Sequence, residues 1–150
     1  MTFNHLVLIG GGHTNVLLLN KWSMCPKLMP EIPVSIISRD SHLVYSAIFP
    51  SVLSKSITLE ESLIDIKSLA TNAKVSFIEE EVKDIDFNLK KIILSNRPSV
   101  NYSKLVLNYG SQTIIPKGFE SLVKNRNAFS IKPFLRAYES ILKELSLIHI

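Results

Sequence analysis

The sequence predicts a three-layer α/β fold with a parallel sheet at its centre and an antiparallel β-hairpin beside it. Three observations predict this class. Short apolar runs of strand length recur along the 150 residues, and helical or turn segments separate them. The first run passes through three consecutive glycines into a helix. Two alternating runs between residues 81 and 94 flank a turn, which indicates the hairpin.

The first expected strand covers residues 5–9, whose apolar run is typical of a strand buried on both faces. The glycines Gly10, Gly11 and Gly12 follow it directly, and a run of helix formers begins at Val16. A Gly-x-Gly-x-x-Gly pattern in this setting predicts dinucleotide binding. Gly10 makes the tight turn and Gly12 lets the backbone approach a pyrophosphate. The alternative is an ordinary glycine-rich turn before a helix.

The start of this helix carries two features of the predicted site. The N–H groups near His13 and Thr14 would face the phosphates together with the positive end of the helix dipole. The third glycine of the pattern is absent, and Asn15 takes its place. That glycine normally permits close packing of helix on strand. We therefore expect either a slightly displaced helix or an Asn15 side chain that reaches toward the ligand.

The second expected strand covers residues 33–38 and ends at Ser38, where dinucleotide sites normally have an acid that holds the ribose hydroxyls. Ser38 can still hydrogen-bond a ribose, with less charge assistance. Asp40 substitutes for the acid if the loop bends inward. Arg39 would face a phosphate or stack on an adenine. Alternatively, all three are ordinary loop residues.

The next segments are a short apolar stretch and a helix. Residues 42–56 are too apolar for a simple exposed loop and predict a short helix or a cover over a ligand. Thr58 to Glu61 has the pattern of a capping box, so we expect a helical segment over residues 63–70. Its apolar positions would share one face: Leu63, Ile66, Leu69 and Ala70.

Two further parallel strands are expected at residues 74–79 and 104–108. Asn108 and Gly110 follow the last one, at the sheet edge where ligands bind in open α/β folds. The three glutamates at residues 79–81 continue an alternating pattern, which favours a strand edge over a catalytic cluster. A last helix is expected from Pro133 onward.

Composition excludes several classes of protein. The 46% hydrophobic and 20% charged content is typical of a globular domain, and no apolar run is long enough to span a membrane. The net charge is +4, and the lysines and arginines are scattered along the sequence, which argues against nucleic-acid binding. A lone cysteine, Cys25, excludes an internal disulfide, and no histidine pair has metal-site spacing. With no signal peptide visible, we expect a cytoplasmic protein.

An ordered set of motifs over about residues 5–136 resembles FAD-dependent pyridine nucleotide-disulfide oxidoreductases, in the branch of the type II NADH dehydrogenases. It is most similar to the oxidoreductase domain fused ahead of selenide, water dikinase (selenophosphate synthetase). That narrower branch also lacks the third glycine and the acid, as at Asn15 and Ser38. The motifs are Leu-Ile-Gly-Gly-Gly-His-Thr at 8–14, Ile-Ser-Arg-Asp at 37–40, Tyr45 and Ser46 with Pro50, Ile64 and Asp65, Leu105 and Val106 leading into Asn-Tyr-Gly-Ser at 108–111, and Ile-Lys-Pro at 131–133.

The resemblance implies FAD as the ligand of the glycine turn and NAD(P)H as the electron donor. The turn and the amides near His13 and Thr14 would carry the pyrophosphate, with Gly110 under the diphosphate. Ser38 and Arg39 would meet the ribose, and the backbone of Val82 would meet the adenine. Tyr45, Ser46 and Pro50 would lie toward the flavin ring. Because the chain has no cysteine pair, electrons would leave for a quinone or another diffusible acceptor.

Members of the resembled family are longer, so residues 1–150 are expected to be the N-terminal part of one truncated FAD/NAD(P)-binding domain. The last six residues resemble either a sequencing-adapter read-through or an ordinary amphipathic helix end. We expect the fragment alone to bind FAD weakly or not at all, and not to catalyse. Two functions stay open for the parent: a flavoprotein oxidoreductase, or a non-catalytic nucleotide-binding module acting as a sensor or as a partner of selenophosphate synthetase.

Overall fold

A computed structural model describes residues 4–109, except for the side chains of Val44, Ser46, Phe49 and Leu53. These residues divide into two compact units. The first contains residues 4–43 and 65–109, and the second contains residues 44–64. Gly110 and the helix expected from Pro133 lie outside the described residues.

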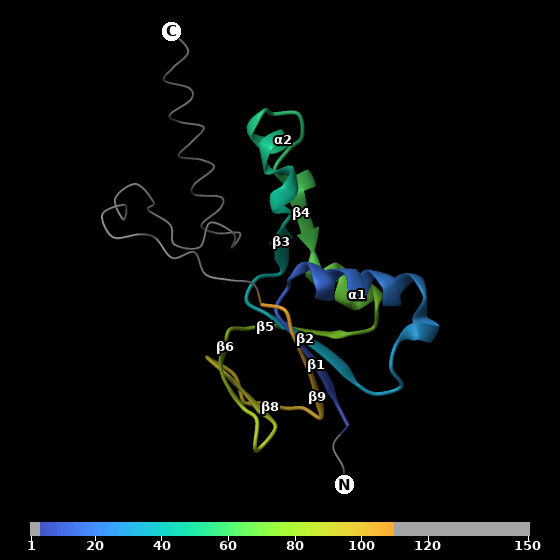
Figure 1. The fold of residues 1–150 in the computed structure, drawn as a ribbon, viewed down its shortest axis with the longest axis vertical. Helices are drawn as coiled ribbons and strands as arrows, with labels where there is room; N and C mark the ends of the chain where they lie inside the picture. The colour runs from blue at the N-terminus through green and yellow to red at the C-terminus, as the bar shows by residue number, and fades with distance from the viewer. Residues whose placement is uncertain (1–3, 110–150) are drawn as a thin grey trace, which may run out of the picture. The chain divides into compact units, whose positions relative to one another are not determined.

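A four-stranded parallel sheet forms the centre of the first unit, in the order β5-β2-β1-β9 (Figure 1). In the central pairs, Leu8 of β1 lies opposite Ile36 of β2 on one side and Val106 of β9 on the other. The sequence prediction of a parallel sheet from these four segments is confirmed. Its strands are β1 (Leu6–Ile9), β2 (Val34–Ser38), β5 (Ser76–Glu79) and β9 (Lys104–Leu107).

The central strands β1 and β2 are buried along their whole length, whereas the edge strands β5 and β9 are exposed at both ends. A strand covered on both faces needs mainly apolar residues, which explains the unbroken apolar run of β1 and the largely apolar β2, where Ser35 and Ser38 are buried. The carboxyl ends of β1, β2 and β9 meet at one edge, where the glycine turn begins.

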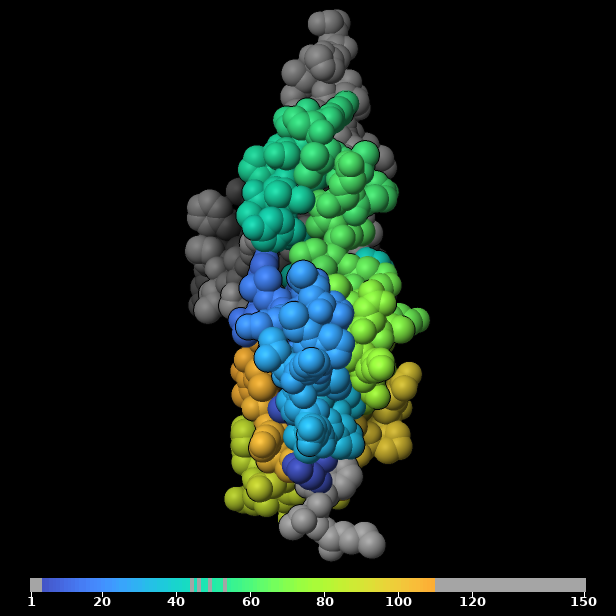
Figure 2. Space-filling view, turned by 90° about the vertical axis from the view of Figure 1, so that its right-hand side faces the viewer, coloured from blue at the N-terminus to red at the C-terminus, as the bar shows by residue number. Residues whose placement is uncertain are grey.

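Helices α1 (His13–Met24) and α3 (Ile66–Asn72) form one layer of the unit. Figure 2 shows the blue surface of α1 beside the lime-green surface of α3. α1 buries Val16, Leu19 and Trp22, and it ends before Pro26, which opens the short 3₁₀ helix η1 (Pro26–Leu28). Proline has no N–H to continue the helix. Cys25, the residue that follows α1, is exposed.

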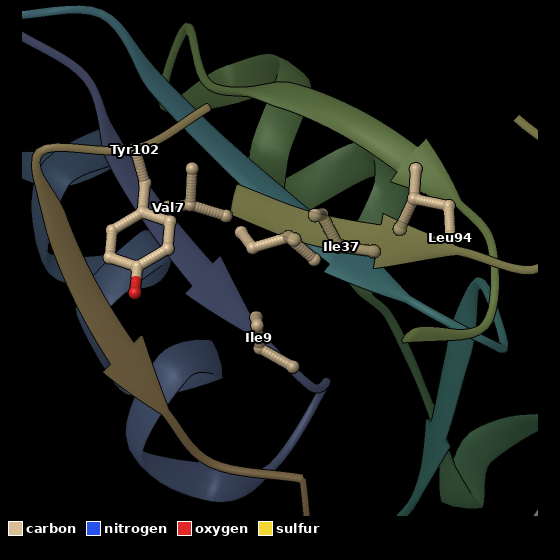
Figure 3. Close-up of a cluster of buried hydrophobic side chains, with 6 residues drawn as sticks. Val7, Ile9, Ile37, Leu94 and Tyr102 are labelled. Atoms are coloured by element: carbon tan, nitrogen blue, oxygen red, sulfur yellow. The ribbon is translucent and has the colours of Figure 1, made fainter. Parts of the chain in front are cut away.

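The antiparallel layer covers the other face of the sheet. It contains β6 (Val82–Asp86), β7 (Lys91–Leu94) and β8 (Val100–Asn101). Ile92, Leu94 and Tyr102 from this side pack with Val7, Ile9 and Ile37 of the parallel sheet (Figure 3). The predicted hairpin is therefore confirmed and gains a third strand, β8. Together these elements make the three-layer fold that the sequence predicts.

The prediction of one helical segment over residues 63–70 is wrong in its first part. The short strand β4 (Leu63–Asp65) precedes α3, and the helix begins at Ile66. The Oδ1 of Asp65 accepts the N–H of Ser68 at 2.9 Å, so the cap fixes the helix start after Asp65. The predicted capping box between Thr58 and Glu61 is present, but it opens only the 3₁₀ helix η3 (Glu60–Ser62).

The second unit begins from a two-stranded ribbon that pairs β3 (His42–Val44) with β4. It continues through η2 (Ser46–Ile48) and α2 (Phe49–Leu53), with Pro50 in the first turn of α2. The short helix expected within residues 42–56 is thus present. Across residues 4–109, no helix has both the length and the apolar character needed to cross a membrane.

Candidate functional site

The glycine turn joins β1 to α1 at the carboxyl edge of the parallel sheet. Gly10 has a φ of 90°, a left-handed conformation that glycine adopts without strain. Its N–H donates to the carbonyl of Ile37 at 2.8 Å, and the N–H of Gly12 donates to the carbonyl of Asn108 at 3.1 Å. Backbone bonds therefore tie the turn to the ends of both neighbouring strands, β2 and β9.

A Cβ at any of the three glycines would force a neighbouring atom to shift, and at Gly10 and Gly12 those neighbours include backbone atoms. A Cβ at Gly10 would collide with the backbone of Asn108 and Tyr109. A Cβ at Gly12 would collide with the side chain and carbonyl of Asn108. At Gly11 it would collide with Cδ1 of Ile66 and lie 3.1 Å from the Oγ of Ser38. The turn is therefore packed closely on its protein side.

The helix start after the turn is suited to an anion. Gly12 is the N-cap of α1 and has no side chain to accept the N–H groups of the first turn. That first turn also carries no acidic residue. His13 and Thr14 are exposed there. A phosphate at this position would receive both backbone N–H groups and the positive end of the helix dipole.

The Asn15 side chain makes contacts that the sequence does not predict, while the two expectations for this position stay predictions. Its side chain is fully buried and turns back toward the strand instead of projecting from the helix. Nδ2 donates to the carbonyl of Gly10 at 2.8 Å and to the carbonyl of Ile9 at 3.2 Å. The carbonyl of Ile9 also accepts the N–H of Asn108 at 2.8 Å. One amide therefore links the helix start to the strand end and the turn.

Two buried acceptors at the turn have no hydrogen-bond partner among the described residues: Oδ1 of Asn15 and Oδ1 of Asn108. The orientation of the Asn15 amide follows from its contacts, because a flipped amide would place Oδ1 against two carbonyl oxygens. A buried acceptor without a donor is costly, so these atoms call for a donor from outside the described chain, such as a water or a ligand group.

The end of β2 shows how Ser38 and its neighbours lie. Ser38 is buried, and its Oγ donates to the carbonyl of Asp40 at 2.8 Å. Its oxygen retains acceptor capacity for a ribose hydroxyl. Asp40 pairs with Arg39 at 3.5 Å between Oδ2 and Nε, and the Arg39 side chain is half exposed. Contact of these three residues with a ribose, phosphate or adenine stays a prediction.

Only a short stretch of chain separates Val82 from Glu80, which is hydrogen-bonded to the end of β2. The N–H of Glu80 donates to the carbonyl of Ser38 at 3.0 Å, and Val82 opens β6 two residues later, opposite Leu94. The chain therefore brings the predicted adenine contact near the predicted ribose contact. The residues predicted to face the flavin ring, Tyr45, Ser46 and Pro50, belong to the second unit, and their position at the site stays a prediction.

The carboxylates with perturbed pKa values are structural caps. Hydrogen bonds from the Ser68 hydroxyl and then the Ser68 N–H lower the pKa of Asp65. Bonds from the backbone and side chain of Thr58 lower the pKa of Glu61. In the 79–81 glutamate run, Oε1 of Glu80 accepts the N–H of Glu81 and the amide of Asn96. Residues 4–109 hold no His, Cys, Asp and Glu cluster suited to a metal ion.

Sequence reasoning missed two tertiary features of the site. Ile66 forms the wall behind Gly11, and the Asn108 side chain lies against Gly12. Burial of Ile66 was expected from helical periodicity, but nothing in the sequence indicates which glycine it meets. The contact between Asn108 and Gly12 depends on β9 pairing directly with β1.

No protein-family model matches the chain. No curated protein matches it either. The solved structures that share its fold include sulfide:quinone oxidoreductase from the hyperthermophilic bacterium Aquifex aeolicus, NADH:rubredoxin oxidoreductase from Clostridium acetobutylicum, and water-forming NADH oxidase from Lactobacillus brevis.

The first similarity has a TM-score of 0.72 at 18% identity and covers 95% of this chain. The second has a TM-score of 0.54 at 18% identity over 75% of this chain, and the third 0.56 at 20% over 76%. At these identities the similarity establishes the fold, a Rossmann-like α/β domain with a parallel sheet and antiparallel strands. The chain spans 32%, 30% and 26% of the three structures, respectively.

Proposed function

We propose that this chain is the FAD-binding part of a flavoprotein oxidoreductase that passes electrons from NAD(P)H through FAD to a quinone or another acceptor. One observation carries the proposal: the Gly10–Gly12 turn joins a buried strand to a helix whose first turn has no side-chain cap and no acid. This combination suits a diphosphate. The buried acceptors of Asn15 and Asn108 beside it fit a bound molecule that brings donors.

In this proposal each part of the edge has a role in binding. Gly10, Gly11, Gly12 and the amides of His13 and Thr14 hold the pyrophosphate, and Gly110 lies beneath it. Ser38 and Arg39, with Asp40 as the nearby acid, hold the ribose, and the Val82 backbone meets the adenine. Tyr45, Ser46 and Pro50 face the flavin. When bound, FAD supplies the electron-transfer chemistry, and these residues supply position and electrostatics.

The names of the compared proteins support the proposal that electrons pass to a quinone or another acceptor. One acts on sulfide and quinone, one on NADH and rubredoxin, and one is a water-forming NADH oxidase. Because the chain spans about a third of their length or less, we assign turnover to a longer protein that contains it. We propose that residues 1–150 alone bind FAD weakly or not at all and do not catalyse. A fused or neighbouring selenophosphate synthetase remains our proposed partner.

A second candidate is a nucleotide-binding module without turnover, which serves as a sensor or partner domain. Ser38 favours it, because a serine at the end of β2 grips a ribose with less charge assistance than an acid. NAD(P)H-driven reduction of bound flavin in the longer protein separates the two. Steady turnover with a quinone excludes the module, and flavin binding without reduction favours it. A selenophosphate synthetase reading frame directly downstream would support the proposed partner.

The direct test is a titration of the 150-residue chain and of a longer form with FAD. Binding is measured by the quenching of flavin fluorescence. The proposal expects weak binding by the short form and tight binding by the long form, which should also be yellow. Gly12→Ala should abolish binding, because a Cβ there collides with Asn108. Asn20→Ala, on the exposed part of α1, is the matched control. A long form that stays colourless after incubation with FAD would refute the proposal.

A further inference from the structure

The first turn of α1 contains a contact that the nucleotide-binding pattern does not require. Asn15 replaces the last glycine of the pattern, yet its side chain lies inside the protein. Its Nδ2 donates to the carbonyls of Ile9 and Gly10. These carbonyls belong to the last residue of β1 and the first residue of the turn. A glycine at position 15 would make neither bond.

We propose that Asn15 is a positioning residue that holds the phosphate-binding turn in its ligand-ready shape before the ligand arrives. The contacts support this role in three steps. The first concerns Gly10, whose φ of 90° is one of several conformations open to a glycine. The bond from Nδ2 to the Gly10 carbonyl, at 2.8 Å, fixes the peptide that follows this dihedral angle.

The second step concerns the neighbouring strand. The Ile9 carbonyl accepts both the Asn15 amide and the N–H of Asn108. Asn108 in turn accepts the N–H of Gly12 through its own carbonyl at 3.1 Å. A short circuit of hydrogen bonds therefore runs from Asn15 through Ile9 and Asn108 to the far end of the turn. Loss of Asn15 removes the only side chain in that circuit.

The third step concerns orientation. The Nδ2 of Asn15 makes two hydrogen bonds to carbonyl oxygens, and Oδ1 has no partner among the described residues. A side chain present only to fill space would not need a buried amide with an unpaired acceptor, because an apolar side chain fills space at lower cost. The two hydrogen bonds from Nδ2 therefore account for an amide side chain at this buried position.

The experiment compares Asn15→Ala and Asn15→Gly with Asn20→Ala in the 150-residue chain. Amide hydrogen exchange is measured by NMR in the absence of ligand, so this part of the experiment does not depend on the proposed function. We expect exchange at Gly10 and Gly12 to rise at least about 10-fold in both Asn15 variants, since one or two hydrogen bonds are lost. The rise at Gly10 and Gly12 should exceed any rise in the β2–β5 pair, which reports the loss of global stability, by at least about 5-fold. Asn20→Ala should leave both regions unchanged.

The affinity arm rests on the proposed function and uses FAD and ADP as probes. Relative to Asn20→Ala, both Asn15 variants should bind each probe about 10-fold more weakly. The loss of affinity should be similar for ADP and FAD, because both carry the diphosphate that the turn is proposed to contact. This arm is measured in the longer form. If its unsubstituted version binds neither probe, the proposed function fails, and the exchange arm still decides the role of Asn15.

Three results would overturn the proposal. Unchanged exchange at Gly10 and Gly12 would show that the turn keeps its shape without Asn15. A uniform rise across the sheet would show that Asn15 stabilises the whole fold and not the turn. Failure of both Asn15 variants to fold, as seen by circular dichroism, would assign the residue to global stability as well.

Discussion

The Nε2 of His5 lies 2.9 Å from the Oγ of Ser35, across the pair of central strands at the end of the sheet opposite the glycine turn. The Nδ1 of the same ring lies 3.1 Å from the carbonyl of Asn101 in β8. A carbonyl only accepts, so in the neutral ring Nδ1 donates to Asn101 and the Ser35 hydroxyl donates to Nε2. His5 thereby joins the antiparallel layer to the parallel sheet.

This contact predicts a measurable coupling between His5 and Ser35. His5→Ala should lower the free energy of unfolding by about 1–2 kcal/mol, because it removes one partly buried and one exposed hydrogen bond. Ser35→Ala should cost about 1 kcal/mol. In a double-mutant cycle by urea denaturation, we expect a coupling energy of about 0.5–1.5 kcal/mol. Strict additivity of the two substitutions would show that the pair contributes no direct stabilisation.

A second prediction concerns the wall behind the glycine turn. Gly11→Ala should destabilise the protein by about 1–3 kcal/mol, because the new methyl group collides with Cδ1 of Ile66. Ile66→Val removes that atom and should recover part of the loss in the double variant. The rescue should be incomplete, since the Oγ of Ser38 also lies 3.1 Å from the new Cβ. Thermal denaturation of the four proteins measures the effect.

Gly10→Ala combined with Ile66→Val is the matched control for this pair. Gly10 has a positive φ, and its Cβ would meet backbone atoms of Asn108 and Tyr109, which cannot move aside. No rescue is expected there. Equal rescue at both positions would mean that Ile66→Val stabilises the fold in general and that the Gly11 contact is not the cause.

The comparison of sequence and structure shows which physical signals are local. The strands, the hairpin and the turn at Gly10 follow from runs of residues that carry their own periodicity and backbone preference. The boundary at Asp65 was missed because Leu63 and Ile66 fit a helical stripe, while pairing of β4 with β3 decides the first three residues. Local periodicity cannot show a strand that exists only through its partner.

The same distinction applies to the site. The glycine turn and the position of Ser38 at the end of β2 are recognisable from spacing alone, whereas their contact with a diphosphate and a ribose stays a prediction. The inward orientation of the Asn15 side chain cannot be recognised from the sequence, since position 15 is compatible with helix packing, ligand contact or a return to the strand. Only the positions of the Ile9 and Gly10 carbonyls select the last of these.

The third prediction concerns stability in acid. The pKa of Asp65 is lowered in the folded state by the Ser68 hydroxyl and N–H, with a smaller contribution from the charge of His42. A lowered folded pKa means that this stabilisation is complete above the unfolded pKa of about 4 and is lost as the pH falls through the folded value. Asp65→Ala should cost about 1 kcal/mol at pH 7 and less below about pH 3.

Asp65→Asn provides the control, because asparagine also caps helices but does not titrate in this range. It should retain most of the stability at pH 7 and lose the dependence on acid that Asp65 contributes. Urea denaturation from about pH 2 to pH 7 compares the three proteins. Identical pH profiles for the unsubstituted protein and Asp65→Ala would contradict the assignment.

The last prediction uses the contrast between the two asparagines at the turn. Both have a buried Oδ1 without a partner among the described residues, but only Asn15 is shown donating from its side chain to the turn. The bonds of Asn108 to Gly12 and Ile9 are made by its backbone and survive substitution. Asn108→Ala removes an unsatisfied acceptor and leaves a small space beside Gly12. These effects oppose each other, since the first stabilises and the second destabilises.

We therefore expect Asn108→Ala to change the free energy of unfolding by less than about 1 kcal/mol without ligand, whereas Asn15→Ala should cost about 1–3 kcal/mol. Urea denaturation of the two variants under identical conditions tests the contrast. A loss for Asn108→Ala as large as that for Asn15→Ala would mean that its Oδ1 already has a donor in the free protein, such as a buried water. Such a water would then be a structural part of the turn, and its displacement would accompany nucleotide binding.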